Sequence, residues 1–478
     1  MRVAAARSAH LDVEQLMHRF LALCIVAVLL TQSAHSDVSE TLTLESAVQL
    51  ALEHNLSLQA SREDYESAKW NLRGARAALL PSVSLSSTAT RVDPDTYERA
   101  NASLGFAEEF GIELEPFLYE TTYETSFRVD VPIWNGGKLW GAAGAATGAR
   151  EAALRSYESA RRSVVVEAKS AYFDLLRSMA LLDVQNDAVL AAERNSQTAE
   201  RRYEIGAVNR AELLRWQAQL ARERVSQVDA EAGVTMARTR LLSVLGLPLD
   251  SDVSLTGVPE SELEAARSHY ESIVGDGPLT EERARQLLSR SPDLAALSAS
   301  TEIARSSMTV ARGAFFPSLN ASGSYGWKAD DDIEPDDETA WSVTLALNLP
   351  VFTSFKNLSD YQSSRRAYLA SLRRREDGER GLVAAFRSAD SAVDSALKRL
   401  AAARLEEEQA SELLKNMRNM REQGVVTYTE LLDSEVLYGL SRVGSVNALY
   451  DCLVALAEAE RLVGDRAPPG MNQDGDDR

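Results

Sequence analysis

Prolines are missing from two long stretches of this chain of 478 residues. None lies between Pro132 and Pro248, and none lies between Pro350 and Pro468. An interior proline removes a helix hydrogen bond and clashes with the preceding turn, so its absence permits long helices. Alanine, leucine, glutamate and arginine, which are all strong helix formers, fill both stretches. Each stretch therefore predicts a helix roughly 100 Å long.

Apolar or small residues recur at steps of three and four in these stretches, as at Val164, Ala168 and Ala171. Such steps form a heptad seam, along which helices pack side by side. Gly206 and Gly424 predict sharp turns between helices, because glycine is the usual residue just past a helix end. The predicted helices cover 43–79, 139–205, 210–246, 280–316, 356–423 and 429–463.

Four short runs alternate apolar with polar side chains, and a period of two is typical of strands. Each run has about ten residues, the length that a tilted strand needs to cross a bilayer. A soluble antiparallel sheet with one buried face would show the same alternation, so this alternative stays open. The runs are 82–92, 122–132, 318–328 and 340–350, and the prolines at the strand–helix junctions are Pro81, Pro132, Pro317 and Pro350.

The chain contains an internal repeat. Segment 79–82 resembles 315–318 at an offset of 236 residues, and 202–206 resembles 420–424 at an offset of 218. The change of offset indicates an insertion in the loop between the strands of the first half. The predicted order is a first repeat at 37–246, a linker or equatorial segment at 247–278, a second repeat at 279–464 and a disordered tail at 465–478.

The N-terminus predicts a signal peptide over 1–36, with a short positive region, an apolar core at 21–30 and small residues at 34–36 for cleavage. The sixteen residues before Met17 add nothing to this signal, and the start of translation, at Met1 or at Met17, is left open together with modification of the mature N-terminus. No run of 18 apolar residues follows residue 36. If the mature chain enters a membrane, it therefore does so as strands.

Four strands cannot close a barrel, and lipid does not tolerate an unpaired strand edge. Two copies would supply eight strands, and side chains just fill the interior of an eight-stranded barrel. Three copies would supply twelve strands and leave a lumen. If these are membrane strands, a channel therefore requires a trimer or a larger assembly.

The net charge is −20 and the sequence has no basic cluster, which argues against nucleic-acid binding. A well-solvated surface or an acidic duct lining would each explain the charge. No zinc-ligand spacing and no nucleotide-binding or nucleophile motif occurs, so we predict no metal, no cofactor and no enzyme activity. The acidic cluster around 330–338 is interpreted as a solvated hairpin loop, with a divalent-ion site as the alternative.

These features together resemble the TolC-like outer-membrane efflux proteins, from about Leu42 to Gly464. The most specific pieces are the turn segments 203–214 (YEIGAVNRAELL) and 423–433 (QGVVTYTELLD). The resemblance implies an α+β membrane protein with a long antiparallel α-helical coiled-coil barrel. Four transmembrane β-strands per subunit would complete a 12-strand β-barrel in a homotrimer. It also implies an outer-membrane location with a large periplasmic portion, and a tube that closes at Gly206 and Gly424. A periplasmic adaptor and an inner-membrane transporter are the implied partners.

The resemblance also suggests site residues. Glu430 and Asp433 occupy the positions of an acidic ring at the entrance, and such rings filter cations. The alternative is ordinary acidity at a helix start, where the helix dipole favours carboxylates. The family arginine that often locks the second turn is replaced by Val426, so we predict an Arg421–Glu212 ion pair as a substitute gate latch.

The predicted function is thus the outer-membrane exit duct of a tripartite efflux or type I secretion system. Drug efflux, metal efflux and protein secretion are not distinguished, nor is the resting state of the gate. The competing hypothesis is a secreted or periplasmic coiled-coil scaffold without channel activity. That hypothesis explains the helices and the acidity but not the four matched amphipathic strands.

Overall fold

The structure is a computed structural model, and it describes residues 42–102, 118–257, 260–275, 277–330 and 339–463. The predicted signal peptide at 1–36, the tail at 465–478 and nearly all of the acidic cluster at 330–338 lie outside these residues.

The chain divides into two compact units, one made of 1–43 with 250–256 and the other of 44–249 with 257–478. In the first unit Leu42 and Leu255 form a parallel bridge, and the Leu42 N–H donates to the Ser254 carbonyl at 2.8 Å. All the named helices and strands belong to the second unit.

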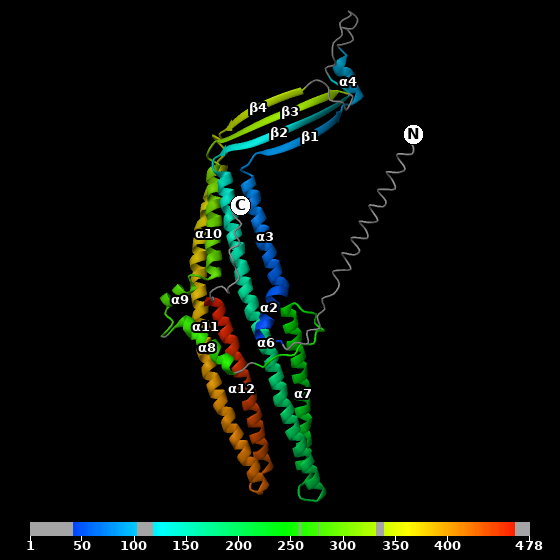
Figure 1. The fold of residues 1–478 in the computed structure, drawn as a ribbon, viewed down its shortest axis with the longest axis vertical. Coiled ribbons are helices and arrows are strands. Elements are labelled where there is room, and N and C mark those ends of the chain that lie inside the picture. The colour runs from blue at the N-terminus through cyan, green and yellow to red at the C-terminus, as the bar shows by residue number, and fades with distance from the viewer. Residues whose placement is uncertain (1–41, 103–117, 258–259, 276, 331–338, 464–478) are drawn as a thin grey trace, which may run out of the picture. The chain divides into compact units, whose positions relative to one another are not determined.

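The second unit contains one antiparallel sheet of four strands in the order β1-β2-β3-β4 (Figure 1). The central pair joins the two halves of the sequence, with Phe127 opposite Tyr325. Within the described chain β1 and β4 each pair with one neighbour, so each has an outer edge without a strand partner. The strands are β1 Ser82–Arg91, β2 Thr121–Asn135, β3 Ser318–Asp330 and β4 Thr339–Asn348.

Both faces of the outer strands β1 and β4 are exposed. Every residue of β1 and of β4 is exposed. In β4 the apolar side chains of Trp341 and Val343 alternate with the polar side chains of Ser342 and Thr344. An exposed apolar stripe of this kind marks a surface that contacts lipid or another protein.

The strand ends differ from the prediction at two prolines. β2 was expected to end at Pro132 but continues to Asn135, and the pairing register shifts between Pro132 and Trp134. A proline has no N–H to give to the ladder, and a bulge is one place where a strand accommodates it. β4 ends at Asn348, before Pro350 rather than at it.

Two helices of 67 residues, α6 and α11, extend for roughly 100 Å each. α6 packs against α3, α7, α10 and α12, and α11 packs against α10 and α12. No helix in the described part of the chain has both the length and the hydropathy of a membrane span. The helices are α2 Leu44–His54, α3 Leu56–Ala77, α4 Pro94–Asn101, α6 Lys138–Glu204, α7 Arg210–Leu245, α8 Glu260–Val274, α9 Glu281–Leu288, α10 Pro292–Gly313, α11 Lys356–Glu422 and α12 Tyr428–Val463.

The single helix predicted over 43–79 is wrong, because the chain breaks at Asn55 into α2 and α3. The Asn55 side chain accepts hydrogen bonds from the N–H groups of Ser57 and Leu58 at 3.0 and 3.1 Å, which caps α3. Its amide also donates to the Val244 carbonyl at 3.0 Å. Asparagine competes with the helix for backbone groups and thus favours a cap over a helix interior.

The helix predicted over 280–316 is also divided, into α9 and α10. Pro292 occupies the first turn of α10, where a missing N–H costs nothing. The predicted linker at 247–278 contains a further helix, α8, whose Tyr270 hydroxyl donates to Asp390 of α11 at 2.9 Å. No proline lies between Pro259 and Pro278, so α8 can form there, and it ends just before Gly275, whose φ is +69°.

Small residues let α6 approach α10 closely just after the sheet. A Cβ added to Gly148 would lie 2.8 Å from the Ile303 side chain and 3.2 Å from its backbone nitrogen. A Cβ added to Gly141 would meet Val310 equally closely. These glycines of α6 are therefore required by helix packing.

We predict that Gly148→Ala lowers the thermal unfolding midpoint of the purified protein, because overpacking a tight contact costs about 1–3 kcal/mol. Gly233→Ala is the matched control, since nothing lies within 4 Å of its added Cβ. That substitution should raise the midpoint, because alanine is favoured over glycine in a helix interior by about 1 kcal/mol. Shifts of the same sign, measured by circular dichroism, would contradict the packing argument.

Candidate functional site

Both long helices end in the same kind of turn. Gly206 follows α6 at φ +71° and Gly424 follows α11 at φ +76°. The Ala207 N–H donates to the Arg202 carbonyl at 2.8 Å, and the Val425 N–H donates to the Met420 carbonyl at 3.0 Å. This pattern is a Schellman motif, in which the left-handed residue is usually glycine. The chain reverses at both positions, into α7 and α12.

The second turn leads into α12 through a reciprocal cap. The Thr427 N–H donates to the Glu430 carboxylate at 2.7 Å, and the Glu430 N–H donates to the Thr427 hydroxyl at 3.4 Å. The Thr427 hydroxyl also donates to the Glu430 carboxylate at 2.7 Å, and this hydrogen bond, with the one from the Thr427 N–H, lowers the pKa of the Glu430 carboxyl. The Thr-x-x-Glu pattern of this capping box is visible in the sequence, but our sequence analysis overlooked it.

The two proposed ring residues are both exposed at the start of α12. Glu430 folds back onto its own helix terminus through the cap, so its charge lies beside the backbone of Thr427. Asp433 lies one helical turn further along. The ring itself requires other subunits.

The first turn leads into α7 differently. Asn209 caps the helix by accepting from the Glu212 N–H at 2.9 Å. The Glu212 side chain extends instead to Arg421 at the end of α11, where its Oε1 lies 3.2 Å from Nη2. Arg421 also donates through Nη1 to the Val426 carbonyl at 2.9 Å. The structure thus contains an ion pair between the predicted latch residues, and it connects the α6–α7 hairpin to the α11–α12 hairpin.

An aromatic contact lies beside this ion pair. The rings of Trp216 and Tyr428 meet edge to face, with centroids 4.3 Å apart and planes at 90°. Both residues are buried, and Leu213 and Leu432 pack against them. Our sequence analysis missed this pair, although Trp216 lies one helical turn after Glu212 and therefore on the same face of α7.

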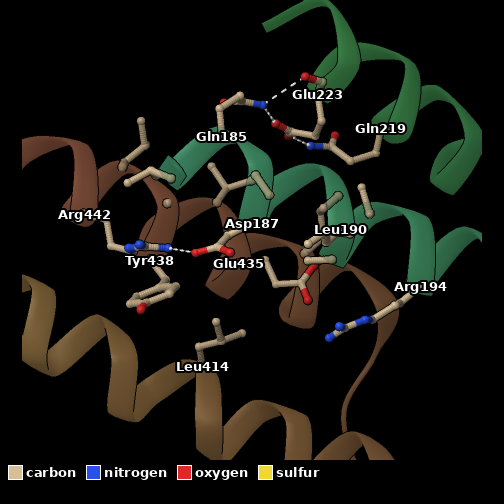
Figure 2. A pocket seen from close by; sticks show the side chains of 18 of the residues that line it. Gln185, Asp187, Leu190, Arg194, Gln219, Glu223, Leu414, Glu435, Tyr438 and Arg442 are labelled. Atoms are coloured by element: carbon tan, nitrogen blue, oxygen red, sulfur yellow. Dashed lines mark hydrogen bonds and ion pairs between the residues drawn. The ribbon is translucent and has the colours of Figure 1, made fainter. Parts of the chain in front are cut away.

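A pocket of about 450 Å³ lies where α6, α7, α11 and α12 converge (Figure 2). Glu435 lines it and accepts a hydrogen bond from Asn195 at 2.9 Å, and Arg418 lies 3.6 Å from its other oxygen. Burial raises the pKa of the Glu435 carboxyl despite these two neighbours. On α6, Gln185 donates to Glu223 of α7 at 2.7 Å. Among the described residues, no group of His, Cys, Asp and Glu is arranged to hold a metal ion.

The alternating four-stranded sheet and the long helical hairpins α6–α7 and α11–α12 together match one family of outer-membrane proteins. The sequence profile described as "Outer membrane efflux protein" matches residues 47–247 and 284–465. The chain belongs to this family.

The similarity to known proteins extends over most of the chain. Outer membrane protein OprJ of Pseudomonas aeruginosa is 24% identical over 438 residues, which cover 88% of this chain and 84% of OprJ. Outer membrane protein TolC of Vibrio cholerae is 23% identical over 415 residues, covering 86% of this chain and 87% of TolC. The crystal structure of the CmeC outer membrane channel of Campylobacter jejuni has a TM-score of 0.74 at 17% identity, covering 88% of this chain and 85% of CmeC. This last likeness concerns the fold.

The opposite pKa shifts of Glu435 and Glu430 predict opposite effects of removing each charge. Glu435 has a raised pKa in the folded protein, so its charge costs stability at pH 8. Glu435→Gln should then raise the unfolding midpoint, and the gain should disappear as the pH falls through the raised pKa toward the ordinary value of about 4.3.

Glu430→Gln is the matched comparison. Its folded pKa is lowered, so its charge stabilises the fold above the ordinary glutamate pKa, and this contribution is lost as the pH falls through the lowered pKa. The variant should melt below the parent at pH 8. Thermal melts from pH 4 to 8 check both, and midpoint shifts of equal sign would contradict the assigned environments.

Proposed function

We propose that three copies of this chain form the outer-membrane exit duct of a tripartite efflux or type I secretion system. The observation that carries the proposal is the four-stranded sheet with open edges at β1 and β4. Backbone groups in lipid must be hydrogen-bonded, so these edges need strands from other copies. Three copies supply a twelve-stranded barrel wide enough for a lumen, whereas eight strands enclose a space that side chains fill.

The duct continues through the periplasm as a tube of the helices from all three copies. Two structural repeats, proposed to span 37–246 and 279–464, build it. In support, the first residues of α6 and α11, Lys138 and Lys356, are 218 residues apart. Each helix has 67 residues, and α7 and α12 have 36 residues each. The matched lengths support a tube in which the two turns lie at the same depth.

The helix turns form the periplasmic entrance, where an adaptor protein and an inner-membrane transporter deliver cargo. Glu430 and Asp433 from each copy supply rings of carboxylates, which favour cations. The Arg421–Glu212 ion pair acts as a latch between the hairpins. With side chains about a quarter exposed, a single pair contributes only about 0–1 kcal/mol, so the latch depends on repetition around the axis.

Strand alternation predicts which substitutions in β4 the membrane tolerates. Val343→Arg should sharply reduce the recovery of outer-membrane trimer, because a cation on the lipid face at mid-membrane costs about 2–4 kcal/mol. Ser342→Arg, on the opposite face, is the matched control and should leave recovery near that of the parent. Membrane fractionation and native mass of the detergent particle, near three times the 52.3 kDa chain less signal peptides, measure this.

A soluble periplasmic monomer or dimer of the parent would overturn the duct and favour the coiled-coil scaffold. Equal recovery of the two arginine variants would contradict the assignment of the faces.

The carboxylate rings predict cation selectivity. Glu430→Gln with Asp433→Asn removes the charge but keeps the shape, so reversal potentials in a salt gradient should fall toward zero. Glu376→Gln with Asp394→Asn is the control with the same charge change, because both carboxylates belong to ion pairs internal to α11. Unchanged selectivity in the double variant would assign Glu430 to helix capping alone.

A further inference from the structure

Near the turns, the α6–α7 hairpin contacts the α11–α12 hairpin through apolar side chains as well as through the Arg421–Glu212 ion pair. Trp216 of α7 and Tyr428 of α12 are 5% and 9% exposed, and Ala199 of α6 completes the cluster. A centroid separation of 4.3 Å with perpendicular planes is a favourable edge-to-face geometry for aromatic rings. Three helices from both repeats therefore meet at this pair.

The ion pair and the aromatic pair respond differently to solvent. The side chains of Arg421 and Glu212 are 24% and 23% exposed, so dissolved salt screens their attraction. The aromatic contact excludes water and carries no charge, so screening leaves it unchanged. At high ionic strength, the aromatic pair is the part of this contact that persists.

The hydroxyl of Tyr428 is buried and has no hydrogen-bond partner among the described residues. A buried hydroxyl without a partner destabilises the arrangement that buries it. If α12 moved away from α7, water would reach this hydroxyl and supply the missing hydrogen bond. Tyrosine therefore makes the closed contact weaker than phenylalanine would.

We propose that Trp216 and Tyr428 form a second latch between the two hairpins of a subunit, independent of salt, whose unpartnered hydroxyl keeps it releasable. The latch rests on the proposed function, because it matters only if the turns form the gate of a duct. Both are positioning residues: they hold α12 against α7 and do not contact cargo.

Single-channel recording of the purified full-length protein in planar bilayers tests the proposal. Trp216→Ala and Tyr428→Ala should each raise the open-state population roughly two- to tenfold, which is the loss of one edge-to-face pair expressed as an equilibrium constant. Tyr428→Phe should lower it below that of the parent, because the closed state no longer buries a free hydroxyl. Loss of packing alone would not produce opposite signs at one position.

Salt separates the two latches. Arg421→Ser should raise the open population in 0.1 M KCl but have little effect in 1 M KCl, where the screening length is about 3 Å. The alanine variants at Trp216 and Tyr428 should act equally at both concentrations. Trp70→Ala is a control for removing a tryptophan, since Trp70 is 65% exposed on α3. Native mass of each variant checks that assembly is intact.

The double variant Trp216→Ala/Tyr428→Ala should open no more than either single variant, because both remove one contact. Additive effects, or a Tyr428→Phe variant as open as the alanine variant, would overturn the latch while the duct stands. A parent protein that forms no channel would instead overturn the proposed function, and the latch with it.

Discussion

The unpaired backbone groups along the outer edges of β1 and β4 are the constraint on which the proposed assembly depends. A four-stranded sheet satisfies its interior ladders by itself but leaves two edges open, and its outer strands bury neither face. In the proposed duct the sheet lies in lipid, where each unmet group would cost several kcal/mol, so the sheet would be complete only as part of a closed barrel. The β2–β3 pair then determines where the helices start, because it brings the beginning of α6 beside the end of α10. The glycines of α6 allow that close approach.

Periodicity made the large elements predictable. A period of two and a run of proline-free heptads are strong signals, and the observed bounds of α7 differ from the predicted ones by a single residue. The errors in the predicted helix bounds arose where a side chain competes with the helix for backbone hydrogen bonds. Asn55 forms a cap in the middle of a helical pattern, and part of its stabilisation comes from Val244, far away in the sequence. Likewise, Ser354 and Phe355 adopt positive φ where the first repeat has Gly136 and Gly137, and no residue preference predicts that.

The site was predictable where position alone decided the contact. The Arg421–Glu212 ion pair was predicted from the family resemblance and is present in the structure, whereas the cap between Thr427 and Glu430 was readable from spacing. The environment of Glu435 and the Trp216–Tyr428 contact were not predictable, because they depend on how four helices converge. Burial of a carboxylate, or of a phenol hydroxyl without a partner, is a property of that convergence rather than of any local pattern.

The glutamates that follow the two turns hold equivalent positions, 218 residues apart, but have diverged in what they bind. Glu430 caps its own helix, α12. In α7 Asn209 is the cap instead, and Glu212 forms an ion pair with Arg421. In the proposed trimer this difference lowers the symmetry of the entrance. Six equivalent hairpins would form a ring with sixfold symmetry, in which every hairpin is held by the same contacts. Two kinds of hairpin alternating around the axis reduce the symmetry to threefold, so that the two sets are held by different contacts.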